Sequence, residues 1–483
     1  MTSDELTGNS ATKLAGLIRA RAVSPVEVAE SYLRRIEELN PRLNAIVTIA
    51  PDLLERAREA EEQVMRGEAL GALHGVPLTI KDTIETGGLL TTSGSSVRSG
   101  YVPAKDAPAV ARLRAAGAIL LGKTNVSEMA LTYESDNPVF GRTLNPHDLR
   151  LTPGGSSGGE AAAISSRLSP AGLGSDLSGS IRIPAHFCGI SGLKPTTGRV
   201  PGAGHFPPST GPYSLGATIG PMARHVEDLS LILSVIEGFN APEFVSAPMA
   251  SSDSKAARLS LKGWRVGWYT DDRVAQVSDS TRQAVFATVH ALEEAGLVAT
   301  EGIPPGVSRG PHLWRALFSR AILGHLSELY GGREEEAGAF VRFMLSSLRS
   351  ETPPAMDEFV SAWAERDQLR AALVEWMTET PLIVAPVGAS HAFEHGARHL
   401  ETGGQTLSIF RAFGYSQTFN VFGLPAVCVP AGRSPEGLPI GVQIIGRPYQ
   451  EEAVLAAAFI VEEALGGWQM PPVALSPTGH NPL

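Results

Sequence analysis

The sequence is poor in cysteine, and it has neither an excess of positive charge nor a long apolar run. Two cysteines among 483 residues, Cys188 and Cys428, cannot build a disulfide framework, so we interpret them as small buried residues in a reducing compartment. The formal net charge of −10 argues against a nucleic-acid partner, because binding phosphates needs clustered Lys and Arg. There is no run of about 18 apolar residues, so we expect no membrane span. The opening MTSDELTGNS lacks the basic and apolar regions of a signal peptide, which favours a cytoplasmic location.

What the sequence does contain is typical of a large globular protein, with 43% apolar and 19% charged residues. Two helices are predicted first, over residues 24–40 and 51–67. Ser24 and Glu27 form the two halves of a capping box at the start of the first helix. From about residue 72, short apolar runs with Gly or Pro at their edges alternate with helical stretches. This alternation predicts an α/β protein in which helices pack on the faces of a sheet.

Two motifs match known site patterns without the context that their mechanisms need. GAILLGKT (117–124) fits the phosphate-loop pattern, but its four central residues predict a buried strand preceded by a helix, the reverse of the required order. HAFEH (391–395) has the spacing of a zinc-protease motif. Gly388 and Gly396 bracket that segment, however, and leave little room for a helix that presents both histidines on one face. We therefore favour neither a nucleotide site nor a metal site.

The stretch TPGGSSGGEAA (152–162) places four glycines and two serines directly before an alanine-rich helix start. GGSSG fits the G-x-S-x-G nucleophile elbow, with Ser156 as the nucleophile. That interpretation requires a later acid and histidine, and the sequence supplies candidates without identifying a pair. The elbow therefore stays open at this point, as does the simpler interpretation of a tight turn.

A second stretch of small residues, GSDLSGSIRIPA (174–185), offers a turn whose backbone N–H groups could form an oxyanion hole. The candidates are Leu177, Ser178, Gly179 and Ser180. Two such turns favour a site at which two loops approach each other, with two plain turns as the alternative. Lys81 is a third unusual feature, because it ends a predicted buried strand, VPLTIK. Its commoner role would be to reach the surface or to pair with Asp82.

Together these features resemble the amidase signature hydrolases, whose fingerprint is a lysine on a strand, a glycine–serine loop and a second glycine-rich turn ending in serine. The spacings of 75 residues from Lys81 to Ser156 and 24 residues from Ser156 to Ser180 fit that layout. The resemblance covers nearly the whole chain. Within the family, residues 124–148 and ALGGWQMPP look most like fatty acid amide hydrolases, and the glutaminase subunit of the tRNA amidotransferase is a more distant look-alike. Ser178 departs from the family, which usually has glycine there.

The resemblance implies that Ser180 is the nucleophile and that Ser156, after a cis peptide bond, relays protons between Ser180 and Lys81. It also implies that residues 177–180 form the oxyanion hole and that no metal or organic cofactor is needed. Residues suggested to lie near the substrate are Met129, Tyr133 and Gly155.

For this chemistry Lys81 has to be neutral, and its pKa has to fall by roughly three units from about 10.4. Burial among hydroxyl groups without a carboxylate contact can supply such a shift. Asp82 must then point away from Lys81, as the alternation of side chains along a strand allows.

The expected architecture is an α/β/α amidase signature fold in one continuous domain, a mixed sheet flanked by helices. It has a helical lead-in (1–70), a catalytic core (71–240 and 405–483) and a helical excursion (241–404) that shapes the substrate pocket. Loose composition near residues 240–262 indicates a linker at the start of the excursion.

The expected function is hydrolysis of a linear amide with an aryl or long-chain acyl group, and esters and carbamates share the same acyl chemistry. Residues 313–321 in the excursion could line an apolar pocket or pack against the core. Two alternatives remain: a glutaminase subunit of an amidotransferase complex, and a non-catalytic binding protein on an amidase-like scaffold. The expected partner is a small amide, with no nucleic acid, and the sequence leaves the oligomeric state open, a homodimer included.

Overall fold

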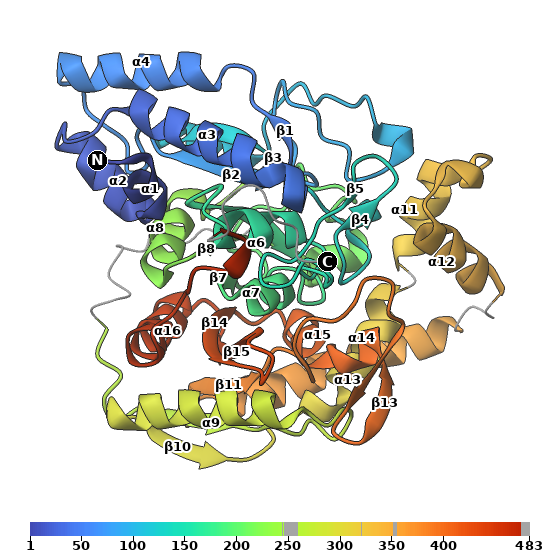
Figure 1. Cartoon of the computed structure of the whole chain (residues 1–483). Coiled ribbons are helices and arrows are strands. Elements are labelled where there is room, and N and C mark those ends of the chain that lie inside the picture. The colour runs from blue at the N-terminus through green and yellow to red at the C-terminus, as the bar shows by residue number, and fades with distance from the viewer. Residues whose placement is uncertain (244, 246–258, 320, 351–354, 475–483) are drawn as a thin grey trace.

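The computed structural model describes residues 1–243, 245, 259–319, 321–350 and 355–474 (Figure 1). Within these residues, eleven strands form one mixed sheet in the order β1-β3-β2-β6-β8-β7-β14-β15-β11-β9-β10. The strands are β1 (Ile46–Ile49), β2 (Pro77–Lys81), β3 (Ile119–Thr124), β6 (Ala171–Asp176), β7 (Ser191–Lys194), β8 (Thr218–Ala223), β9 (Arg265–Trp268), β10 (Val298–Glu301), β11 (Leu382–Pro386), β14 (Ala426–Arg433) and β15 (Pro439–Gly446). The expected α/β/α architecture, a mixed sheet flanked by helices, is confirmed.

Helices cover both faces of the sheet (Figure 1). The larger ones are α2 (Ala11–Arg19), α3 (Pro25–Leu43), α4 (Leu53–Arg66), α5 (Pro108–Ala115), α6 (Gly158–Ser165), α7 (Arg182–Cys188), α8 (Val226–Ile236), α9 (Asp279–Glu294), α11 (Ala321–Tyr330), α12 (Ala339–Ser350), α13 (Met356–Trp376), α15 (Gly414–Val421) and α16 (Glu451–Leu465). Helix α16 contacts both α8 and α9, and all three contact the sheet, whereas α6 and α7 pack side by side elsewhere on it. No helix in the described ranges is long and apolar enough to cross a membrane.

Alternation along the strands divides the interior into two apolar cores. In β11, Leu382 and Val384 belong to one core, and Ile383 and Ala385 belong to the other. All four side chains are fully buried. Because successive strand residues point to opposite faces, a central strand needs apolar residues at nearly every position. This requirement explains the continuous apolar runs that mark the strands in the sequence.

The local predictions for the lead-in are confirmed. Helix α3 begins after Ser24, whose side chain accepts from the backbone N–H of Glu27 while the Glu27 carboxylate accepts from the Ser24 N–H. The stretch 241–404 contains helices, as expected, but it also contributes β9, β10 and β11 to the sheet. Most of the predicted linker at 240–262 lies outside the described residues.

The candidate site lies where β2 and β6 end. These strands are parallel neighbours, with Thr79 opposite Gly172 and Ile80 opposite Leu173. Their carboxyl ends therefore meet at the same edge of the sheet. The loops that precede α6 and α7 cross this edge and bring the two glycine–serine turns to it.

Candidate active site

Lys81 is the last residue of β2, and its side chain is fully buried. Its Nζ lies 2.7 Å from Ser156 Oγ and 2.9 Å from Ser175 Oγ. Burial lowers the pKa of Lys81 to about 7, although the negative charges of Asp176 and Glu160 oppose the shift. Lys81 is therefore neutral in a large fraction of molecules at neutral pH, which a proton acceptor requires.

Asp82 points away from Lys81, as strand alternation predicts. Its Oδ2 accepts hydrogen bonds from the backbone N–H and the hydroxyl of Thr92, at 3.0 and 2.6 Å. Burial raises the pKa of Asp82, while the charge of Lys123 lowers it. The carboxylate next to Lys81 in sequence thus belongs to a different group of buried residues.

Ser156 lies in the glycine–serine loop directly before α6, and the Gly155–Ser156 peptide bond is cis. A Cβ on Gly155 would lie 2.4 Å from the Glu134 carbonyl oxygen and 2.6 Å from that of Thr132. The glycine therefore allows the chain at 132–134 to pass very closely over the loop. Close backbone approach is thus one reason for the unusual glycine content of this stretch.

The two glycine–serine turns meet, because the Ser157 N–H donates to the Ser180 carbonyl at 3.3 Å. Ser156 and Ser180 both line a cavity of about 50 Å³. Among the hydrogen bonds of the described residues, none joins the two hydroxyl groups directly. The cavity is lined by Met129, Ala130, Leu131, Ser156, Ser175, Asp176, Leu177, Ser180, His205, Pro207, Ser209, Tyr213, Ala217 and Ile322.

The 177–180 turn is fixed from outside by side chains that bind its carbonyl groups. Trp314 Nε1 donates to the Leu177 carbonyl at 2.8 Å, and Tyr133 Oη donates to the Ser178 carbonyl at 2.9 Å. The Gly179 N–H donates to Asp176 Oδ1 at 2.8 Å. Of the four candidate oxyanion donors, the Gly179 N–H is therefore already used in a hydrogen bond to Asp176.

Gly179 has a φ of 106°, and a Cβ there would lie 2.6 Å from Ser416 Cβ. Glycine is thus required at this position. Ser178 is not among the residues with positive φ. Its backbone conformation accepts a side chain without strain, which explains how the chain departs from the family pattern here.

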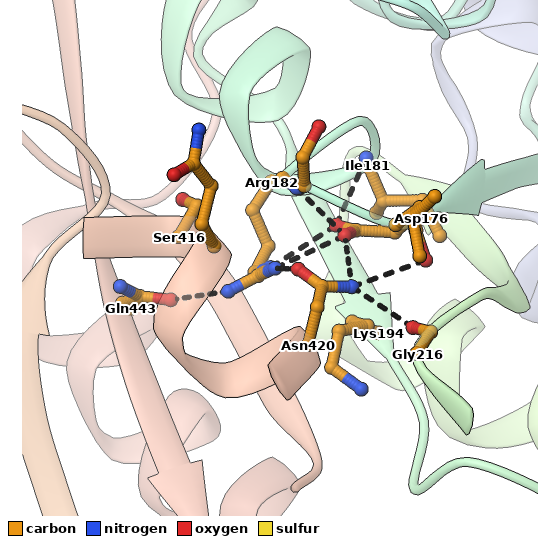
Figure 2. Close-up of polar contacts among 12 residues, drawn as sticks. Asp176, Ile181, Arg182, Lys194, Gly216, Ser416, Asn420 and Gln443 are labelled. Carbon is orange, nitrogen blue, oxygen red and sulfur yellow. Dashed lines mark hydrogen bonds and ion pairs between the residues drawn. The ribbon is translucent and has the colours of Figure 1, made fainter. Parts of the chain in front are cut away.

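Behind the turn lies a buried ion pair between Asp176 and Arg182, 3.0 Å apart and fully excluded from solvent (Figure 2). Burial alone would raise the pKa of Asp176, but Arg182 holds it well below its ordinary value. Asn420 donates to Asp176 Oδ1 at 2.9 Å, and Arg182 donates to Gln443 Oε1 at 2.7 Å. The pair connects the start of α7 to α15 and β15 and holds the turn in place.

The suggested substrate residues have different surroundings. Met129 lines the cavity beside Ser156 and Ser180. Tyr133 is buried, and its hydroxyl binds the Ser178 carbonyl and accepts from Gln417 Nε2 at 2.9 Å. Gly155 lies under the 132–134 segment and is not among the described cavity-lining residues. Tyr133 and Gly155 therefore shape the site from behind its wall.

The apolar residues suggested for the excursion pack mainly into the core. Leu313, Leu317 and Phe318 are at most 1% exposed and belong to the apolar core on the α7 side of the sheet. Of this helical region, Ile322 lies in the cavity lining. The second of the two interpretations, packing against the core, thus describes most of the segment.

Neither the phosphate-loop-like motif (117–124) nor HAFEH (391–395) contributes a residue to the described lining of the cavity. Residues 119–124 form the buried strand β3, as predicted. HAFEH is not helical, and His395 Nδ1 lies 3.2 Å from Glu134 Oε2. The described ranges contain no group of three or more His, Cys, Asp or Glu side chains arranged to hold a metal ion.

Two residues at the site are not identifiable from the sequence. Ser175 Oγ contacts Lys81, and His205 Nε2 lies 2.8 Å from Ser175 Oγ. Ser175 belongs to the second small-residue stretch, but its orientation toward Lys81 depends on the pairing of β6 with β2. His205 lies in the segment GAGHFPP, which has no helical or strand periodicity.

Comparisons with known proteins agree with this geometry. A family model described as "Amidase" matches residues 27–455. A glutamyl-tRNA(Gln) amidotransferase subunit of Carboxydothermus hydrogenoformans is 33% identical, over 95% of this chain and 98% of that protein. The protein of the same name from Bdellovibrio bacteriovorus is also 33% identical, with the same coverage of both chains.

Solved structures extend the comparison to stand-alone hydrolases. A structure of 6-aminohexanoate cyclic dimer hydrolase has a TM-score of 0.86 and 30% identity, over 98% of this chain and 99% of that chain. A bacterial aryl acylamidase described as belonging to the amidase signature family has a TM-score of 0.87 and 25% identity, over 97% and 99%. These comparisons do not place the chain beside fatty acid amide hydrolases in particular, so that finer resemblance stays a prediction. With a matching family model over most of its length and relatives aligned nearly end to end, the chain belongs to the amidase signature family, whose enzymes act on amide carbon–nitrogen bonds.

Proposed function

We propose that the protein hydrolyses an amide through an acyl-enzyme on Ser180, with Ser156 as proton relay and Lys81 as base. The observation that carries the proposal is the 2.7 Å contact between Lys81 Nζ and Ser156 Oγ in a buried site where burial brings the pKa of Lys81 to about 7. A neutral lysine at this distance accepts the Ser156 proton. Ser180 lines the same cavity and is 5% exposed, whereas Ser156 is fully buried, so Ser180 is the more accessible of these two hydroxyl groups.

The steps follow from these roles. Lys81 Nζ takes the proton of Ser156, Ser156 takes that of Ser180, and Ser180 Oγ bonds to the amide carbon. The proton returns through Ser156 to the amide nitrogen as the C–N bond breaks and the amine leaves. Water then attacks the ester carbon by the same route, releasing the acid and restoring the Ser180 hydroxyl. All of these proton transfers use groups of this chain.

The negative oxygen formed in each step needs hydrogen-bond donors. The backbone N–H groups of Leu177, Ser178 and Ser180 are suited to this role, because the Gly179 N–H already donates to Asp176. The bonds from Trp314 and Tyr133 hold the turn before substrate arrives. Such preorganisation lowers the barrier, because no donor has to be reoriented during the reaction.

The cavity favours an uncharged acyl group. Half of its described lining is apolar, with Met129, Leu131 and Ile322 on the walls. Asp176 is the charged side chain in that lining, and it is already paired with Arg182. Aryl or alkyl acyl amides therefore suit the cavity better than substrates with free charges, and esters or carbamates of similar shape share the chemistry.

A second candidate is glutamine hydrolysis within an amidotransferase complex. It is favoured by the curated relatives, which are named as amidotransferase subunits and match this chain over nearly its full length. Free glutamine carries an ammonium and a carboxylate, so its binding would require ionic partners beyond the lining described here. An isolated chain would then hydrolyse glutamine weakly and co-purify with other subunits.

The decisive experiment treats the purified chain with a fluorophosphonate and maps the adduct by peptide mass spectrometry. We expect label on Ser180 that is lost in Lys81→Ala. Label on Ser156 would instead support the nucleophile elbow. Absence of label from a folded protein would favour the non-catalytic binding protein.

Substrate choice is tested with a series of acyl anilides of increasing chain length, with glutamine as the charged comparison. An apolar acyl site predicts that kcat/KM rises with chain length to a limit. A flat series, together with glutamine turnover that appears on adding partner subunits, would favour the second candidate.

A further inference from the structure

A continuous line of hydrogen bonds leads from Lys81 through Ser175 to His205. Lys81 Nζ lies 2.9 Å from Ser175 Oγ, Ser175 Oγ lies 2.8 Å from His205 Nε2, and His205 Nδ1 lies 2.8 Å from the Pro207 carbonyl oxygen. Ser175 and His205 both line the cavity that contains Ser156. His205 makes no hydrogen bond to Ser156 or Ser180 among the contacts of the described residues, so its direct partner is Ser175.

The direction of each bond follows from chemistry. A carbonyl oxygen only accepts, so His205 Nδ1 carries a proton and donates to Pro207. Burial lowers the pKa of His205 to about 4, so the ring is neutral near pH 7 and Nε2 is an acceptor. The Ser175 hydroxyl therefore donates to Nε2. Its remaining lone pairs accept from Lys81 Nζ.

This assignment decides where the lone pair of Lys81 points. A neutral amine has two N–H bonds and one lone pair. Ser175 Oγ accepts from one N–H, and the Ser175 carbonyl oxygen, which can only accept, lies 3.5 Å from Nζ and is the partner for the other. Ser156 Oγ, at 2.7 Å, is then the partner left for the lone pair. If the Ser175 hydroxyl were free to rotate, it could donate to Nζ and compete with Ser156.

We infer that His205 is a positioning residue which, through the Ser175 hydroxyl, directs the lone pair of Lys81 toward Ser156. The inference rests on the proposed function, because it concerns the base of that reaction. It predicts that what matters at position 205 is a hydrogen-bond acceptor at the place of Nε2. The donor at Nδ1 serves to set the tautomer.

The backbone holds the His205 loop without help from the imidazole. The Phe206 N–H donates to the Thr83 carbonyl at 2.8 Å, and the Glu85 N–H donates to the Gly204 carbonyl at 2.8 Å. The Arg98 guanidinium also lies 3.7 Å from the centre of the Phe206 ring. Substitutions of the His205 side chain should therefore leave the loop in place.

Two matched variants separate positioning from a merely structural role. In His205→Gln, the amide oxygen lies near the place of Nε2 and can accept from Ser175. In His205→Asn, the shorter amide lies near the place of Nδ1, so it can bind Pro207 but cannot reach Ser175. The measurement is the rate of fluorophosphonate labelling of Ser180 as a function of reagent concentration, with thermal unfolding recorded for every variant.

We expect His205→Asn to lower the maximal labelling rate by about tenfold, the effect of losing the one hydrogen bond that fixes the Ser175 hydroxyl beside Lys81, with half-saturation unchanged. His205→Gln should restore most of the rate. Ser175→Ala should be as slow as His205→Asn, and the double variant no slower than either, because both changes break one chain of contacts.

Other results overturn the inference. Rescue by asparagine and not by glutamine would assign His205 to anchoring Pro207. Additive losses in the double variant would separate its role from that of Ser175. Equal rates in all variants, with Ser180 labelled in the wild type, would overturn the inference and leave the proposed function intact. A folded wild type without label on Ser180 would overturn both.

Discussion

Lys81 and Lys123 are buried to the same extent on neighbouring strands, yet their surroundings suit them to different tasks. In the pairing of β2 with β3, Lys123 lies opposite Ile80 and Lys81 lies opposite Thr124, so the two side chains extend to opposite faces of the sheet. Both are fully buried. Burial lowers the pKa of Lys81 to about 7 and that of Lys123 to about 8. Burial and pKa alone therefore do not identify the base.

The difference lies in the partners. Lys123 Nζ donates to the Ile84 carbonyl and lies 2.9 and 3.2 Å from the hydroxyls of Thr86 and Thr91. These three acceptors take all three N–H donors of the Lys123 ammonium group, and the negative charge of Asp82 stabilises its charged form. Lys81 instead faces serine hydroxyls beside a cavity. The hydroxyls of Thr86 and Thr91 already donate to backbone carbonyls, at 3.1 Å each, so they act as acceptors toward Lys123. The Ser156 hydroxyl makes no such bond among the hydrogen bonds of the described residues, so it can give its proton to Lys81.

The largest effect should come from replacing the two lysines with methionine. Lys81→Met removes the base and should slow fluorophosphonate labelling of Ser180 by about 10²–10⁴-fold. Lys123→Met should label at nearly the wild-type rate, while its free energy of unfolding falls by about 1–3 kcal/mol because the Ile84 carbonyl loses its buried donor. Denaturant unfolding supplies the second measurement. Equal loss of labelling in both folded variants would contradict the conclusion that Lys81, and not Lys123, is the base.

The pH dependence of labelling should follow Lys81. Its neutral form is the active one, so the rate should rise about tenfold per pH unit below a pKa of about 7 and level off above it. Lys123→Met should show the same curve, because Lys123 does not take part. A midpoint near 4, the pKa to which burial lowers His205, would assign the base to the imidazole instead.

A smaller effect is expected from a matched pair of variants that each remove one hydroxyl partner of a lysine. Ser175→Ala removes an acceptor from Lys81 and should slow labelling by about tenfold. Thr91→Val removes an acceptor from Lys123 and should leave the labelling rate unchanged. Thermal unfolding of both proteins controls for stability. A slow Thr91→Val variant with normal unfolding would show that the Lys123 cluster supports the site.

Part of the difference between the surroundings of Lys81 and Lys123 can be predicted from the sequence. Lys81 and Ser156 each belong to a recognisable local pattern, a strand end and a glycine-rich turn, but the prediction that they meet comes from the resemblance to the amidase signature hydrolases. Lys123 is assigned to a buried strand because the residues before it are continuously apolar. Its hydroxyl partners are not identifiable in this way, because they lie in a loop without periodicity.

The network around the site depends on contacts between distant segments. His205 reaches Ser175 because an isolated antiparallel bridge joins it to Ile84, just after the end of β2. Trp314 and Tyr133 meet the oxyanion turn from 137 and 45 residues away. No local pattern of apolar and polar residues encodes such contacts. The sequence therefore predicts the reacting groups better than it predicts the groups that hold them.

Ser178 tests whether the hydroxyl group in the oxyanion turn matters or only the hydroxyl groups bonded to Lys81. Ser178→Gly restores the residue usual in the family and should change the labelling rate by less than about twofold, because the backbone N–H and the carbonyl bond to Tyr133 remain. Gly179→Ala is the control. Its Cβ would meet Ser416 and its φ of 106° disfavours a side chain, so that variant should lose labelling. A large loss in Ser178→Gly would instead assign the Ser178 hydroxyl a part in binding the oxyanion, and the functional surroundings of Lys81 would then extend beyond its own hydrogen bonds.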